Sequence, residues 1–78
     1  MGLTLMGLAV EERRDTSPRL QTVLSEFGRE ILLRVGLPVP DGRRGLITLV
    51  VSAEEERVDE LARRLEEVDG VTVKTLSF

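Results

Sequence analysis

Two apolar runs that contain no charged residue, LTLMGLAV at residues 3–10 and LITLVV at residues 46–51, constrain the fold of this chain most strongly. In each run, apolar side chains stand at both odd and even positions. This pattern is typical of a strand that is covered on both faces, which means a strand in the middle of a sheet. We therefore expect the two runs to be central strands and neighbours.

Two further segments have the composition of strands but carry a charge. In residues 71–78 (VTVKTLSF), Lys74 lies opposite the valines. In residues 30–39 (EILLRVGLPV), Arg34 and Gly36 fall on one face, and the other face holds Ile31, Leu33, Val35 and Leu37. An outward charge, and prolines at the end of a strand, are typical of sheet edges. We expect both segments to be edge strands.

A first helix is predicted between residues 17 and 28. Ser17 followed by Pro18 indicates an N-cap and a first helical residue. Apolar residues then recur at helical spacing up to Phe27, and Gly28 is expected to end the helix in a left-handed conformation.

The second helix and the central turn have similar signals. Ser52 and Glu55 form the S-x-x-E pattern of a capping box, and Gly70 is expected to end this helix. In residues 31–51, the Asp41–Gly42 pair predicts a chain reversal between two strands. The glycine spacing there matches neither a P-loop nor a dinucleotide-binding fingerprint, so we interpret the stretch as a hairpin.

These elements follow the order β-α-β-β-α-β over residues 1–78, which we interpret as one domain. Right-handed crossovers around a central hairpin fold this order into a ferredoxin-like α+β sandwich. The prediction is a four-stranded antiparallel sheet with two helices on one face.

Two helices cannot cover both faces of such a sheet, so apolar residues should project from the other face. The residues expected there are Met6, Leu8, Leu46, Val50 and Leu76. A chain of 78 residues builds only a small core, and it has no cysteine for disulfides. We therefore expect a homodimer or homotetramer, formed by back-to-back sheets or by edge-strand pairing.

Composition excludes several classes of function. The chain has no histidine, cysteine or tyrosine, so we predict no enzymatic activity, no metal site and no cofactor. A net charge of −3 argues against direct binding to nucleic acid. No apolar stretch approaches the roughly 20 residues that span a bilayer, and we expect a cytoplasmic protein without membrane contact.

The loop at residues 11–17 (EERRDTS) is the candidate ligand site. It combines two arginines with a helix N-terminus, whose free N–H groups favour anions. The candidate residues are Arg13, Arg14, Asp15, Thr16 and Ser17. The structural alternative is a solvated loop that caps the helix.

Two segments, ILLRVGLPV (residues 31–39) and GVTVKT (residues 70–75), carry a resemblance to a known family. The chain, over about residues 20–76, resembles the "putative iron-only hydrogenase system regulators", whose members look like ACT domains and like the C-terminal domain of the nickel-responsive repressor. The resemblance implies an ACT-like fold, oligomers and a regulatory role. This chain lacks the histidine and cysteine of the repressor's nickel site, and Arg19 replaces a glycine that ACT domains have before the first helix.

Two hypotheses of function follow. In the first, the chain is an oligomeric sensor that binds a small anionic metabolite or an amino acid near Arg13 at a subunit boundary. In the second, it is an oligomeric adaptor that binds another regulatory protein and no small molecule.

Overall fold

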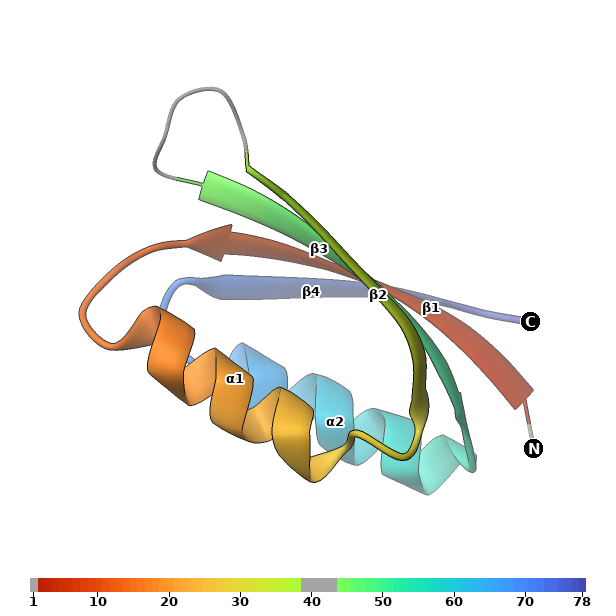
Figure 1. The fold of residues 1–78 in the computed structure, drawn as a ribbon. Coiled ribbons are helices and arrows are strands. Elements are labelled where there is room, and N and C mark those ends of the chain that lie inside the picture. The colour runs from red at the N-terminus through yellow and green to blue at the C-terminus, as the bar shows by residue number, and fades with distance from the viewer. Residues whose placement is uncertain (1, 39–43) are drawn as a thin grey trace.

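The computed structural model describes residues 2–38 and 44–78 and contains two helices packed on one antiparallel sheet (Figure 1). The elements are β1 (Gly2–Glu11), α1 (Thr16–Glu26), β2 (Ile31–Pro38), β3 (Arg44–Ala53), α2 (Glu55–Glu66) and β4 (Val71–Ser77). The strand order is β2-β3-β1-β4. The predicted ferredoxin-like sandwich is confirmed, with both uncharged runs in central strands and both charged strands at the edges.

The core lies between the sheet and the two helices. Its fully buried side chains come from both layers and include Met6, Leu8, Leu49, Phe27, Leu61 and Leu65. The prediction that Met6 and Leu8 project from the uncovered face is therefore wrong, because both are 0% exposed beneath the helices. Both strands have apolar residues at odd and at even positions, so the sequence does not reveal which set faces the helices. Packing between neighbouring strands decides it.

Strand β2 contains an irregularity that changes its predicted faces. Ile31 lies opposite Val51 and Leu33 lies opposite Val50, with a register shift between the two pairs. Neighbouring residues of β3 point to opposite faces, so Ile31 faces the helices and Leu33 faces away from them. The prediction that Ile31 shares a face with Leu33 is wrong, since one extra residue in the strand reverses the alternation.

Helix α1 begins earlier than predicted. Asp15 is its N-cap in a left-handed conformation with φ 62°, so Ser17 and Pro18 are the second and third helical residues. Pro18 still lies in the first turn, where its missing N–H removes no helical hydrogen bond. The helix ends at Glu26 with Phe27 as C-cap, and Gly28 does not adopt a positive φ, which corrects the predicted glycine cap.

Helix α2 also differs at both ends. Glu54 is its N-cap, and Ser52 still belongs to β3, so the predicted capping box does not form. The helix ends at Glu66, and Gly70 lies beyond the C-cap, directly before β4. Gly70 has a φ of 95°, which confirms that a glycine is needed there but not that it ends the helix.

The hairpin interpretation of residues 31–51 is confirmed by the antiparallel pairing of β2 with β3. The Asp41–Gly42 pair lies outside the described residues. Within the described part of the chain, neither helix has the length and apolar character that crossing a membrane requires.

Candidate functional site

The predicted loop is held in place by the turn that follows α2. Thr16 is 0% exposed, and its Oγ1 accepts a hydrogen bond from the backbone N–H of Arg13 at 2.9 Å. The same hydroxyl donates to the backbone carbonyl of Asp69, also at 2.9 Å. Thr16 therefore joins two loops that are more than 50 residues apart in the sequence.

Gly70 brings these two loops into close contact. The backbone N–H of Glu11 donates to the carbonyl of Gly70 at 2.8 Å. A Cβ atom added at Gly70 would lie 2.2 Å from the carbonyl oxygen of Glu11, which is far inside contact distance. Only a glycine fits there, because both the positive φ and the neighbouring backbone exclude a side chain.

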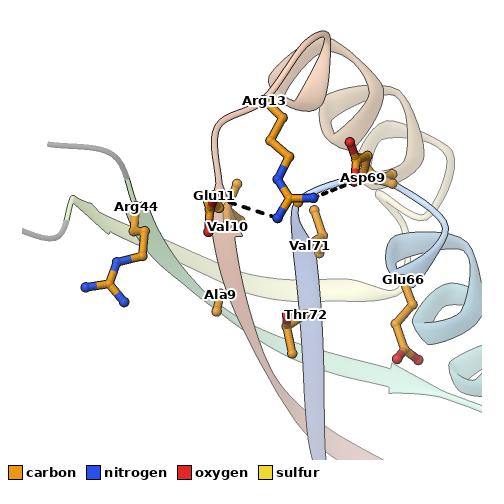
Figure 2. A pocket seen from close by; sticks show the side chains of 11 residues that line it. Ala9, Val10, Glu11, Arg13, Arg44, Glu66, Asp69, Val71 and Thr72 are labelled. Carbon is orange, nitrogen blue, oxygen red and sulfur yellow. Dashed lines mark hydrogen bonds and ion pairs between the residues drawn. The ribbon is translucent and has the colours of Figure 1, made fainter.

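Arg13 reaches across this junction toward two carboxylates (Figure 2). Its Nη1 lies 2.8 Å from Oδ1 of Asp69, and its Nη2 lies 3.6 Å from Oε1 of Glu11. All three side chains are at least half exposed, and such ion pairs contribute between zero and about 1 kcal/mol. These carboxylates therefore hold the Arg13 guanidinium only weakly.

A cavity of about 430 Å³ lies beside Arg13, between the end of β1 and the start of β4. It is lined by charges of both signs, from Glu11, Arg13, Arg44, Glu66 and Asp69. Figure 2 shows these side chains coming from β1, the loop after it, β3, α2 and the turn before β4. The mixed charge suits a ligand that carries both a carboxylate and a cationic group better than a simple anion.

The N-terminus of α1 already holds a carboxylate from the chain itself. Glu12 accepts a hydrogen bond from the backbone N–H of Ser17 at 3.2 Å and from its hydroxyl at 2.5 Å. An external anion at this helix end would have to replace Glu12.

The structure thus divides the five predicted site residues into groups. Arg13 and Thr16 meet Asp69 and Gly70, whereas Ser17 pairs with Glu12. Arg14 and Asp15 are exposed and do not line the cavity. Sequence reasoning missed Asp69 and Gly70 as part of this site, although an Asp-Gly pair directly before a strand is a turn signal that could have marked them.

A second charged cluster covers Phe27 between the two helices. The guanidinium of Arg57 lies 4.0 Å from the ring centre of Phe27, and its Nε donates to Glu30 at 2.9 Å. Arg64 makes a two-point ion pair with Glu26 on the same side. These hydrogen bonds lower the pKa of the Glu26 and Glu30 carboxyls and raise the pKa of both guanidinium groups.

The cluster predicts a loss of stability in acid. Because the pKa of Glu30 is lowered below its ordinary value of 4.5, its ionised form stabilises the folded state above that pH. The contribution is lost as the pH falls through the lowered pKa. We expect Glu30→Gln to unfold at lower denaturant than the wild type at pH 7, with the difference shrinking to nothing on acidification. Urea titrations across this range test it, with Glu66→Gln as an exposed control outside the cluster.

The sheet face opposite the helices is the second candidate site. It consists of three cross-strand rows, which together we call the open face. The rows are Leu33–Val50–Leu5–Leu76, Val35–Thr48–Gly7–Lys74 and Leu37–Leu46–Ala9–Thr72. The prediction that Leu46, Val50 and Leu76 lie on this face is confirmed.

The open face is mostly apolar and exposed to solvent. Its large side chains with 44–63% exposure are Leu33, Val35, Leu37, Leu46 and Leu76. Lys74 is the only charged residue in the three rows. A contiguous exposed patch of this kind marks an interaction surface in soluble proteins. Among residues 2–38 and 44–78, by contrast, no three acidic side chains converge in an arrangement that could hold a metal ion.

Comparison with known proteins connects this architecture to a family. Residues 2–75 match the TM1266-like family, described as "Iron-only hydrogenase system regulator, putative". The structure is similar to that of the uncharacterized protein TM1266 from Thermotoga maritima, with a TM-score of 0.92 and 30% identity. That alignment covers 97% of this chain and 95% of the other. No curated protein matches the sequence.

Two more distant structures share the fold. The ACT domain of GTP pyrophosphokinase from Chlorobium tepidum is 22% identical, with a TM-score of 0.76, over 97% of this chain and all of that domain. The C-terminal domain of MgtC from Mycobacterium tuberculosis is 10% identical, with a TM-score of 0.70, over the whole chain and 88% of that domain. The predicted resemblance is confirmed, and this chain belongs to the TM1266-like family.

Proposed function

We propose that the chain is a non-catalytic regulatory domain that acts in the cytoplasm as a homo-oligomer within an iron-only hydrogenase system. Membership of a regulator family and the ACT-like fold support the regulatory role. The observation that supports self-association is the open face, where leucine and valine side chains of all four strands are at least partly exposed. Covering this face stabilises a chain whose own core is small.

The open face approaches the size of a standard interface. A standard interface removes about 800 Å² per partner from water, and the whole surface of the chain is 5316 Å². Four strands of 7 to 10 residues form a face on the order of 500 Å² in projection, and projecting side chains raise its accessible area. The two central strands, β1 and β3, leave no edge unpaired beneath this face, because each has a neighbouring strand on both sides.

Sedimentation velocity at micromolar concentration tests the oligomer. We expect a dimer or tetramer that dissociates on dilution, because association is driven by burial of the open face. A monomer that persists at the highest soluble concentration would contradict this part of the proposal.

We further propose that the regulator senses a small anionic metabolite or an amino acid, with Arg13 as the main contact of its anionic group. The ligand carboxylate or phosphate would replace Asp69 and Glu11 on the guanidinium, while the cavity beside β4 holds its body. The weak, exposed ion pairs of Arg13 and the cavity of about 430 Å³ support this assignment. An amino acid also fits, because Glu66 and Asp69 offer partners for an ammonium group.

Thermal-shift screening against amino acids, nucleotides and inorganic phosphate tests the sensor. A ligand at 100 times its Kd is expected to stabilise the fold by about 2.7 kcal/mol. Arg13→Gln should abolish the shift, and Arg14→Gln should leave it unchanged, because Arg14 lies on the same loop but outside the cavity. An equal shift in both variants would place the ligand elsewhere.

An adaptor function without a small-molecule ligand is the second candidate, and one contact favours it. Glu12 already satisfies the N–H of Ser17 at the helix end, so this loop is complete without a ligand. If no compound in the screen shifts the melting temperature while the chain is oligomeric, the adaptor is favoured over the sensor.

A further inference from the structure

The two sides of the open face, β2–β3 and β1–β4, differ in the size of the side chains that project from them. Strands β2 and β3 present large side chains in every row except at Thr48. Strand β1 presents Leu5, Gly7 and Ala9, and a Cβ added at Gly7 would meet nothing within 4 Å. A hollow of about 420 Å³ lies over this glycine, between Leu5, Thr48, Lys74 and Leu76. We call the β2–β3 side the raised half and the β1–β4 side the hollow half, in which Leu5, Lys74 and Leu76 surround the hollow over Gly7.

Such a face is complementary to itself under one arrangement of two copies. A face-to-face pair with two-fold symmetry has its axis in the plane of the interface. An axis parallel to the strands reverses the strand order, so that β2 and β3 of one copy lie over β4 and β1 of its partner. The raised half of each copy then packs into the hollow half of the other copy. An axis perpendicular to the strands instead places each strand over its own copy, raised half against raised half.

The charge of Lys74 favours the same axis. With the perpendicular axis, β4 lies over the partner's β4, and the two Lys74 side chains meet within an apolar layer, where like charges repel strongly. With the parallel axis, the two lysines are separated sideways by three strand spacings, about 14 Å. Each lysine then packs its aliphatic stem against the partner's Val35 and extends its ammonium group past the sheet edge into water.

We infer that two copies of this chain pack open face to open face about a two-fold axis parallel to the strands, with β2 and β3 of each copy over β4 and β1 of the other. This inference rests on the proposed homo-oligomer and adds its geometry. A second copy fits better than a small amphiphile or an unrelated protein, because the large side chains of β2 and β3 and the hollow over Gly7 lie on the same face of the same chain.

Cysteine cross-linking tests the axis directly, because the chain has no cysteine of its own. Equal amounts of the single variants Val35→Cys and Lys74→Cys are mixed, allowed to exchange subunits and treated with a short thiol-to-thiol linker. We expect a covalent dimer that contains one copy of each variant, identified by mass spectrometry. Lys74→Cys alone should give no covalent dimer. Cross-linking of Lys74→Cys to itself, or no cross-link in a sample that sedimentation shows to be dimeric, would overturn the inferred axis.

Filling the hollow provides an independent test with a matched control. Gly7→Val adds its side chain to open space in the isolated fold but blocks the partner, so the dimer dissociation constant should rise at least tenfold. Gly36→Val makes the same change in β2 on the helix-facing side, where a Cβ meets Ile47 at an ordinary 3.8 Å, and should leave association unchanged. Equal dissociation constants for both variants and the wild type would refute the packing. A monomeric wild type would instead refute the oligomer itself.

Discussion

Replacing Gly70 by alanine is expected to lower the free energy of unfolding by about 3 kcal/mol. Two costs combine. The backbone at Gly70 has a φ of 95°, which a residue with a Cβ adopts only under strain. The added carbon would also lie 2.2 Å from the Glu11 carbonyl oxygen and would push apart the loops that Thr16 and Glu11 join.

Equilibrium denaturation in urea, at one fixed protein concentration, measures this effect. Gly36→Ala is the control, because its Cβ has room and its φ is not positive. The same loops position Arg13, so Gly70→Ala should also weaken any ligand that depends on that arginine. A loss of less than 1 kcal/mol would mean that the contact between the two loops relaxes easily and does not fix the geometry of the site.

Replacing Leu46 by glutamate is expected to weaken self-association at least 100-fold, which corresponds to about 2.7 kcal/mol. Leu46 is 52% exposed on the open face, so the isolated chain tolerates a charge there. In an oligomer joined through this face, the carboxylate would be buried without a partner, and that costs several kcal/mol.

Leu32→Glu is the matched control for Leu46→Glu. Leu32 is 62% exposed, but it lies in the irregular part of β2 and belongs to none of the three rows. Sedimentation equilibrium of both variants should show a monomer for Leu46→Glu and an unchanged oligomer for Leu32→Glu. If both variants behave like the wild type, the oligomer forms through another surface.

The candidate site was only partly predictable, for reasons that particular residues make clear. The sequence indicates Arg13 and Thr16, because a loop with arginines before a helix is a local pattern. Their partners Asp69 and Gly70 are more than 50 residues away, and nothing local to residues 11–17 points to them. The sequence places Gly70 at the end of α2, because a glycine after a helical pattern gives the same signal whether it caps a helix or permits a close approach.

By itself, the sequence determined the identity and order of the elements, the central position of the two uncharged strands and the family. The elements and their places depend on local composition and on the number of layers that two helices and four strands can form, whereas the family was indicated by the resemblance of residues 31–39 and 70–75. Only the tertiary structure decided which side of each strand faces the helices. Met6 and Leu8 lie in the core while Leu5, Gly7 and Ala9 lie on the open face, because the choice depends on how side chains of different strands pack together. The register shift in β2 likewise arises from pairing with β3, and it moves Ile31 and Leu33 to opposite faces.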